Sequence, residues 1–134
     1  MHSSQDRLVY LIDDNDTVRD STVVLLESAY IEAKAYASGR VFLKEFEPSA
    51  GCCIILDLHM PDISGFEVLD ILRERGNTVP VVLFSGRADA ITEERVRRSG
   101  AVALLTKPVA QDALVELIQR LLSEKSSADA ARPS

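Results

Sequence analysis

The sequence has little of what membrane, secreted and nucleic-acid-binding proteins need. No apolar run approaches the roughly 18 residues of a membrane-spanning helix, and residues 1–7 are too polar for a signal peptide. The net charge is −6, from 15 basic and 21 acidic residues, whereas binding to a phosphate backbone relies on clustered Lys and Arg. We therefore expect a cytoplasmic protein that enters no membrane and binds no nucleic acid through this chain alone.

Cysteine is scarce as well. The two cysteines, Cys52 and Cys53, are adjacent in the sequence, and adjacent cysteines could not pair with each other without severe strain. They lead into an apolar run, which favours buried, reduced thiols. This composition is also consistent with the cytoplasm.

The 134 residues fit one domain. Folding at this size buries roughly two-thirds of the surface of the unfolded chain, which is enough for a single core. We expect the domain to span residues 8–122. A frayed terminus is expected at 1–7, and a flexible tail or the start of a linker at 123–134, where Ser, Ala and Asp dominate.

Five short apolar runs alternate with helical patterns along the chain. The runs predict strands at 8–12, 31–36, 52–56, 81–84 and 101–106, of which 31–36 has the charges of an edge strand. Helices are predicted at 17–28, 39–46, 65–75, 90–99 and over a stripe of apolar residues at 114–122. Continuous apolar strands between helices indicate a five-stranded parallel sheet covered on both faces. The fold class is therefore α/β, a doubly wound three-layer sandwich.

Polar residues follow four of the predicted strands. Asp13 and Asp14 follow the first, Asp57 the third, Ser85 the fourth and Lys107 the fifth. Each has an ordinary explanation, because Asp13 or Asp14 could cap the next helix and the others could lie in turns. Those explanations do not account for their joint occurrence at the edge where ligands bind in such sheets.

The chemistry of these residues fits one site. The carboxylates have ordinary pKa values near 3.9, and two like charges ~4 Å apart repel by about 4 kcal/mol at an effective dielectric of 20. A divalent cation would relieve this repulsion, and oxygen ligands suit Mg²⁺, with Mn²⁺ as an alternative. A carboxylate can accept a phosphoryl group. The metal, Lys107 and Ser85 could then stabilise the charge that moves during transfer.

The chain resembles the response-regulator receiver family of the CheY-like superfamily. The resemblance rests on LIDD at 11–14, LDLHMP at 56–61, SG at 85–86 and KP at 107–108, and it covers roughly residues 8–122. It implies a flavodoxin-like (βα)5 fold with strand order 2-1-3-4-5. The subgroup most similar to it is the FixJ type, on the segments YAS at 36–38, GC at 51–52 and GAV at 100–102.

The resemblance implies how the acidic residues act. Asp57 matches the phosphoacceptor, and Asp14 should bind Mg²⁺ directly together with Asp57. Asp13 should act through a metal-bound water, and the backbone carbonyl of His59 should be a further ligand. A metal-binding role for the His59 ring is disfavoured, because no second His or Cys is nearby in the sequence.

The resemblance also implies roles at the last two strands. Ser85 matches the switch hydroxyl, and Gly86 matches the small residue that leaves room for the phosphoryl group. Lys107 should pair with the phosphoryl oxygens, and its bond to Pro108 is typically cis in this family, which is uncommon for X–Pro bonds in general.

One position departs from the family pattern, and two others should tune the reaction. Leu104 stands where the family usually has a rotating Tyr or Phe, so switching through an aromatic ring is in doubt, and the ordinary interpretation is a core residue. His59 and Arg87 should flank the path of attacking water and so tune the lifetime of the aspartyl phosphate.

The implied function is regulatory. A sensor histidine kinase or a phosphotransfer protein would donate the phosphoryl group to Asp57, and the chain would switch conformation to control an output domain, most often one for transcription, or a partner protein. We expect no enzymatic activity beyond phosphotransfer and autodephosphorylation, and a homodimer that depends on phosphorylation.

Three alternatives compete with this function. A phosphatase with an aspartyl-phosphate intermediate would need a second Asp where His59 stands. A flavodoxin-like module that binds a nucleotide or a flavin would need a glycine-rich loop after the first strand, where Asp13 and Asp14 stand instead. A receiver that never takes phosphate is disfavoured because the expected acidic residues are all present.

Overall fold

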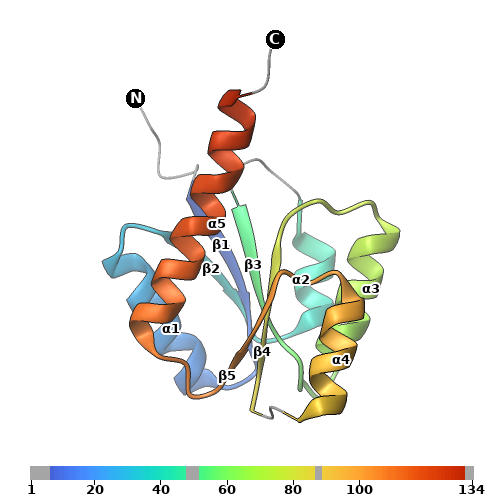
Figure 1. The fold of residues 1–134 in the computed structure, drawn as a ribbon. Helices are drawn as coiled ribbons and strands as arrows, with labels where there is room; N and C mark the ends of the chain where they lie inside the picture. The colour runs from blue at the N-terminus through green and yellow to red at the C-terminus, as the bar shows by residue number, and fades with distance from the viewer. Residues whose placement is uncertain (1–6, 48–51, 87–88, 132–134) are drawn as a thin grey trace.

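The computed structural model describes residues 7–47, 52–86 and 89–131, with side chains up to Ser123. Strands and helices alternate strictly along the chain (Figure 1). Their bounds are β1 Leu8–Ile12, α1 Asp16–Ser28, β2 Glu32–Tyr36, α2 Gly39–Glu45, β3 Cys52–Asp57, α3 Gly65–Glu74, β4 Val81–Ser85, α4 Ala90–Ser99, β5 Ala103–Thr106 and α5 Gln111–Ala131.

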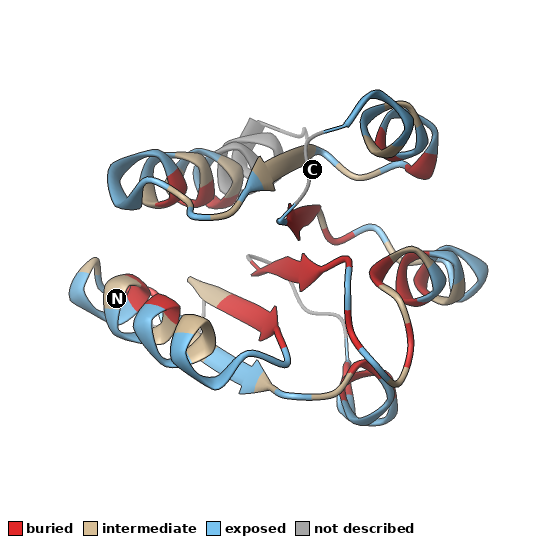
Figure 2. Ribbon diagram, turned by 90° about the horizontal axis from the view of Figure 1, so that it is seen from below, coloured by how far each residue is buried: buried red, intermediate tan, exposed pale blue. Residues whose placement is uncertain are grey.

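The strands form one parallel sheet in the order β2-β1-β3-β4-β5. Helices α1 and α5 cover one face of this sheet, and α2, α3 and α4 cover the other (Figure 2). The predicted doubly wound sandwich and its strand order are therefore confirmed. So is the edge position of β2, whose Glu32 and Lys34 are exposed.

Two hydrophobic cores lie on opposite faces of the sheet, and successive residues of the central strands point into them alternately. In β3, Ile54 and Leu56 pack into the core beneath α2–α4, whereas Cys53 and Ile55 pack into the core beneath α1 and α5. Because both faces are covered, a central strand must be apolar at every position, and this is why the predicted strands were uninterrupted apolar runs.

The two thiols follow the same alternation. Cys52 points into the core beneath α2–α4 and Cys53 into the other core. Both are buried, as predicted, and burial raises the pKa of Cys53 to about 12. A thiol with so high a pKa stays protonated at neutral pH and is a poor nucleophile.

Helix ends follow local signals where these exist. A capping box begins α3, with Glu67 N donating to Ser64 Oγ and Ser64 N donating to the Glu67 carboxylate. Gly100 ends α4 with a φ of 89°, in the left-handed region that favours glycine. The chain turns at this point, so β5 begins at Ala103 and not at residue 101.

The last helix is longer than the sequence indicated. The structure continues α5 to Ala131, whereas a tail was expected from Ser123 onward. The segment 124–131 contains Ala, Glu and Lys, which are strong helix formers, so the helix continues beyond the apolar stripe at 114–122.

Of the expected frayed terminus at 1–7, residues 1–6 lie outside the described residues. None of the helices in the part of the chain that the structure describes is long and apolar enough to cross a membrane.

Candidate functional site

The residue after β1 is fully buried and held from several sides. Asp13 is 0% exposed, its backbone N–H donates to Tyr36 O at 3.1 Å, and its Oδ1 accepts from Asn15 N at 2.9 Å. Asn15 in turn caps α1 by accepting from Val18 N. The helix cap is therefore Asn15, and neither Asp13 nor Asp14 is used for capping.

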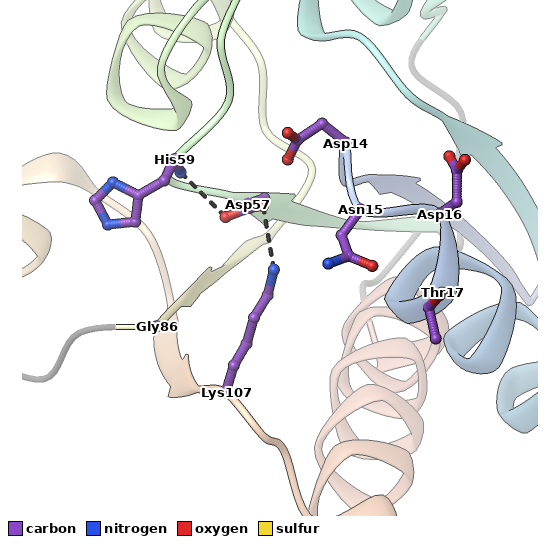
Figure 3. Close-up of a pocket in the computed structure, with 8 residues that line it drawn as sticks. All are labelled: Asp14, Asn15, Asp16, Thr17, Asp57, His59, Gly86 and Lys107. Carbon is purple, nitrogen blue, oxygen red and sulfur yellow. Dashed lines mark hydrogen bonds and ion pairs between the residues drawn. The ribbon is translucent and has the colours of Figure 1, made fainter.

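Asp57, the last residue of β3, is 4% exposed and engaged at both carboxylate oxygens. The backbone N–H of His59 donates to Oδ1 at 3.0 Å, and Lys107 Nζ donates to Oδ2 at 3.1 Å (Figure 3). These bonds fix the carboxylate at the carboxyl edge of the sheet while the rest of the strand remains in the core.

The backbone around Asp57 is packed directly against the first turn of α3. Gly65 N donates to Leu58 O at 3.0 Å, and a Cβ on Gly65 would lie 2.6 Å from Asp57 O and 2.8 Å from Leu58 Cα. Real Cβ atoms do not approach backbone so closely, so only glycine fits here. The start of α3 thus sets the position of the Asp57 peptide.

Lys107 follows β5 and joins the two buried carboxylates. Its Nζ lies 3.0 Å from Asp13 Oδ2 and 3.1 Å from Asp57 Oδ2. Its own backbone N–H donates to Ser85 O at 2.8 Å, and the Lys107–Pro108 peptide bond is cis. One ammonium group therefore faces two carboxylates on neighbouring strands.

The pKa values of Asp57 and Lys107 are both raised. Burial raises the pKa of Asp57 above its ordinary value of 3.8 and the charge of Asp13 adds to this, although the His59 N–H and Lys107 oppose it. Burial alone would lower the pKa of Lys107, but hydrogen bonding and the charges of Asp13 and Asp57 raise it overall. The lysine remains a cation, and the carboxylates retain uncompensated negative charge.

A cation fits this arrangement. Ligand oxygens of Asp13, Asp14 and Asp57 all lie within 4.8 Å of one another. Apart from its ion pair with Lys107, the buried Asp13 Oδ2 has no hydrogen-bond donor among the described residues. Hard carboxylate oxygens suit Mg²⁺ or Mn²⁺, and the exposed Asp14 leaves one side open to water.

Ser85 ends β4 and Gly86 follows it, at the same edge of the sheet as Asp57. Ser85 is fully buried, and its Oγ lies 3.2 Å from Nε2 of the exposed His59 ring. Gly86 lines the cleft, and a Cβ there would meet nothing within 4 Å, so the space beside it is open. The sequence did not indicate the contact between His59 and Ser85. Arg87 lies outside the described residues.

Leu104 does not reach the carboxylates and packs at the side of the sheet. It is partly buried in β5 against the core beneath α2–α4, which includes Val96 of α4. This agrees with the ordinary interpretation of Leu104 as a core residue. A groove of about 310 Å³ lies between Leu104, Val96 and the exposed Val102.

The site opens into a cleft of about 800 Å³. Its lining residues come from the first turn of α1 and from the ends of β3, β4 and β5 (Figure 3): Asp14, Asn15, Asp16, Thr17, Asp57, His59, Gly86 and Lys107. The sequence singled out five of these eight residues. It missed the three from the start of α1, whose only signal was the Asn two residues after Asp13, a preferred helix cap.

Comparison with known proteins identifies what the chain is similar to. A family model described as "Response regulator receiver domain" matches residues 9–119. The response regulator protein TodT of Pseudomonas putida is 32% identical over 120 residues, which are 90% of this chain and 53% of TodT. The transcriptional regulatory protein FixJ of Azorhizobium caulinodans is 33% identical over 118 residues, which are 88% of this chain and 56% of FixJ. The chain thus spans little more than half of the length of these relatives.

Solved structures of response regulators have a similar fold. The response regulator StyR superposes with a TM-score of 0.83 at 30% identity, over 93% of this chain and 63% of StyR. A CheY-like receiver domain protein from Methanospirillum hungatei superposes with a TM-score of 0.82 at 24% identity, over 91% of this chain and 98% of that one. The second likeness bears on the fold alone.

Proposed function

This chain belongs to the response regulator receiver family, and from that premise we propose that Asp57 accepts a phosphoryl group in a reaction that depends on Mg²⁺. The observation that carries the proposal is the convergence of Asp57, Asp13, Asp14 and Lys107 at one edge of the sheet. These residues are up to 94 positions apart in the sequence (Asp13 to Lys107).

The cation would be held by oxygen ligands. Asp14 and Asp57 would bind it directly, Asp13 through a water molecule, and the backbone carbonyl of His59 would be a further ligand. When bound, the ion supplies positive charge that neutralises the phosphoryl oxygens. The buried Asp13 Oδ2, which pairs with the Lys107 ammonium, and the mutual distances of the three carboxylates support this donor set.

The transfer step is a displacement at phosphorus. A carboxylate oxygen of Asp57 attacks the phosphorus of a phosphohistidine on a sensor kinase or a phosphotransfer protein. A P–O bond forms, the P–N bond to the imidazole breaks, and the donor histidine leaves with its electron pair and takes up a proton. Lys107 stabilises the negative charge of the moving group, and Gly86 leaves space for it.

The new dianion would then change the surroundings of Asp57. The Ser85 hydroxyl and the Lys107 ammonium would turn to the phosphoryl oxygens, and the segments after β4 and β5 would follow. Moving a two-state equilibrium from 1:99 to 99:1 takes about 5.5 kcal/mol, which a few charge-assisted hydrogen bonds can supply. Because Leu104 is aliphatic, the change would reach α4 through backbone shifts.

The regulated output lies beyond the receiver domain itself. The relatives are named as response regulators and transcriptional regulators, and the chain matches only about half of each. We propose that residues 8–122 form the receiver unit and that 123–134 lead toward an output domain or a partner protein. A homodimer through α4 and β5 would be formed on phosphorylation.

The test is phosphoryl uptake from a small phosphodonor, acetyl phosphate or phosphoramidate, with Mg²⁺, read by intact mass. The native chain should gain one phosphoryl group, and chelation of the metal should suppress the gain. Asp57→Asn should gain none, because an amide oxygen is a poor nucleophile. The matched control is Asp70→Asn on the exposed face of α3, which should be phosphorylated like the native chain. Uptake by Asp57→Asn would refute the assignment.

A further inference from the structure

Arg19 of α1 is partly buried beside the acidic loop and bonds to its backbone. Its side chain is 17% exposed, and Nη1 donates to the carbonyl oxygen of Asp13 at 2.8 Å. On its other side, Asp13 donates through its own N–H to Tyr36 O at 3.1 Å. The backbone of Asp13 is thus held at both ends, and the peptide that leads into Asp14 has a fixed orientation.

The same guanidinium holds a further carboxylate. Arg19 Nη2 lies 2.6 Å from Asp16 Oδ1, and the Asp16 side chain is 81% exposed. Asp16 lines the cleft, but Figure 3 shows its carboxylate directed away from Asp57, whereas the carboxylate of Asp14 is directed toward it. Arg19 therefore keeps this extra negative charge apart from the three carboxylates at the sheet edge.

An ion pair of the same spacing on α4 shows what is special about Arg19. Arg97 also pairs with a carboxylate three residues earlier, Glu94, but the Arg97 side chain is 74% exposed. Surface pairs of that kind contribute little to stability, because water screens both charges. Arg19 is instead drawn out of water, and its charge-assisted bond to a backbone carbonyl makes up for this. The difference points to a role in the loop itself.

We propose that Arg19 is a positioning residue for the divalent cation. By holding the Asp13 carbonyl and the Asp16 carboxylate, it presents the carboxylate of Asp14 to the cation site and keeps Asp16 out of it. This inference rests on the proposed function, because it concerns the affinity of the same site. Groups of this kind, which orient a metal ligand without touching the metal, change affinity by about 10- to 100-fold when they are removed.

The experiment measures Mn²⁺ binding in the absence of any phosphodonor, from the electron paramagnetic resonance signal of free Mn²⁺. Arg19→Met, which keeps an unbranched stem and removes the guanidinium donors, should weaken Mn²⁺ binding about tenfold or more. Arg19→Lys keeps the charge, but one ammonium group does not span both partners, so its affinity should lie in between. Arg97→Met removes the matched pair on α4 and should bind Mn²⁺ like the native chain.

Thermal unfolding in a chelator shows that each variant is folded at the temperature of the titration. If Arg19→Met does not fold, Arg19→Gln replaces it, since a neutral polar side chain is easier to accommodate beside the Asp13 carbonyl. This variant also lacks the guanidinium that spans both partners, so it should still bind Mn²⁺ more weakly than the native chain. A folded Arg19→Met or Arg19→Gln with native affinity would overturn the inference and leave the proposed function intact. Failure of the native chain to bind Mn²⁺ would overturn the proposed metal site instead.

Discussion

The central strands have two regions that are equally buried and chemically opposite: an apolar body and charged or polar carboxyl ends. All six residues of β3 are buried, but the first five are apolar and the sixth is Asp57. Burying a large apolar side chain stabilises a fold by about 1.5–3 kcal/mol, whereas burying a carboxylate destabilises it unless the charge is well paired. Between Leu56 and Asp57, the contribution of burial to the stability of the fold therefore changes from favourable to unfavourable.

The buried carboxylates at the carboxyl ends of the strands are only partly paired with positive charge. One lysine faces two buried carboxylates, Asp13 and Asp57, and the pKa of Asp57 is raised. The body of the sheet thus supplies the stability that the ends reduce, and the uncompensated charge is what would attract a cation. Substitutions in the apolar body should therefore lower the free energy of unfolding, whereas neutralising the charged end should raise it.

The largest effect is expected in the body of the strand. Leu56→Ala should lower the free energy of unfolding by about 3 kcal/mol, because it removes a fully buried side chain and leaves a cavity in the core beneath α2–α4. Urea denaturation followed by circular dichroism measures the change. Ile91→Ala, at a side chain that is 83% exposed, serves as the control and should change stability by less than about 0.5 kcal/mol.

A smaller loss is expected where the two regions meet. Gly65→Ala places a methyl group against Asp57 O and Leu58 Cα, and backbone cannot move aside as a side chain would, so a loss of about 2 kcal/mol is expected. Phosphoryl uptake should slow as well, since the Asp57 peptide must shift. Gly86→Ala, which meets nothing within 4 Å, should keep native stability. Equal stability of the two variants would contradict the close approach.

The smallest effect is expected at the charged end, and its sign is reversed. Asp57→Asn should raise the free energy of unfolding at neutral pH by about 1 kcal/mol, in the range of substitutions that relieve a strained functional site. The raised pKa means that the folded chain holds this proton more tightly than the unfolded chain does. The penalty is therefore absent below the ordinary value of 3.8 and grows as pH rises through the folded pKa.

Urea denaturation over a pH series checks this sign. The gain of Asp57→Asn over the native chain should be larger at neutral pH than in acid, and it should vanish as the pH falls toward 3.8 and below. A variant that is less stable than the native chain at neutral pH would show that the pair with Lys107 outweighs the burial of the Asp57 charge.

The sequence predicted the sheet well because burial on both faces leaves a simple pattern. Strand β1 is an uninterrupted apolar run, and β3 and β4 are apolar up to their last residues, Asp57 and Ser85. The charges of Glu32 and Lys34, which are exposed in the structure, indicated that β2 is an edge strand. The extension of α5 was not predicted, because the apolar stripe ends at Leu122 and helix propensity alone is a weak signal.

The positions of the site residues could be predicted for a similar reason. Parallel strands place their carboxyl ends at one edge, so Asp13 and Asp57 had to lie side by side once β1 and β3 were neighbours. Lys107 follows β5, on the far side of β4, and its long side chain reaches both carboxylates from there. The contact of Arg19 with the Asp13 carbonyl and that of His59 with Ser85 could not be predicted. They depend on how long side chains fold back over loops, and no local pattern in the sequence encodes this.

The alternation of Cys52 and Cys53 across the sheet provides two built-in reporters. Each thiol reacts with an alkylating reagent only when the layer of helices above it opens, and the two layers belong to different helix sets. Labelling rates of the single-cysteine chains, Cys52→Ala and Cys53→Ala, would therefore report the opening of the α1/α5 layer and of the α2–α4 layer separately. The two halves of the sandwich can thus be timed against each other without adding a probe.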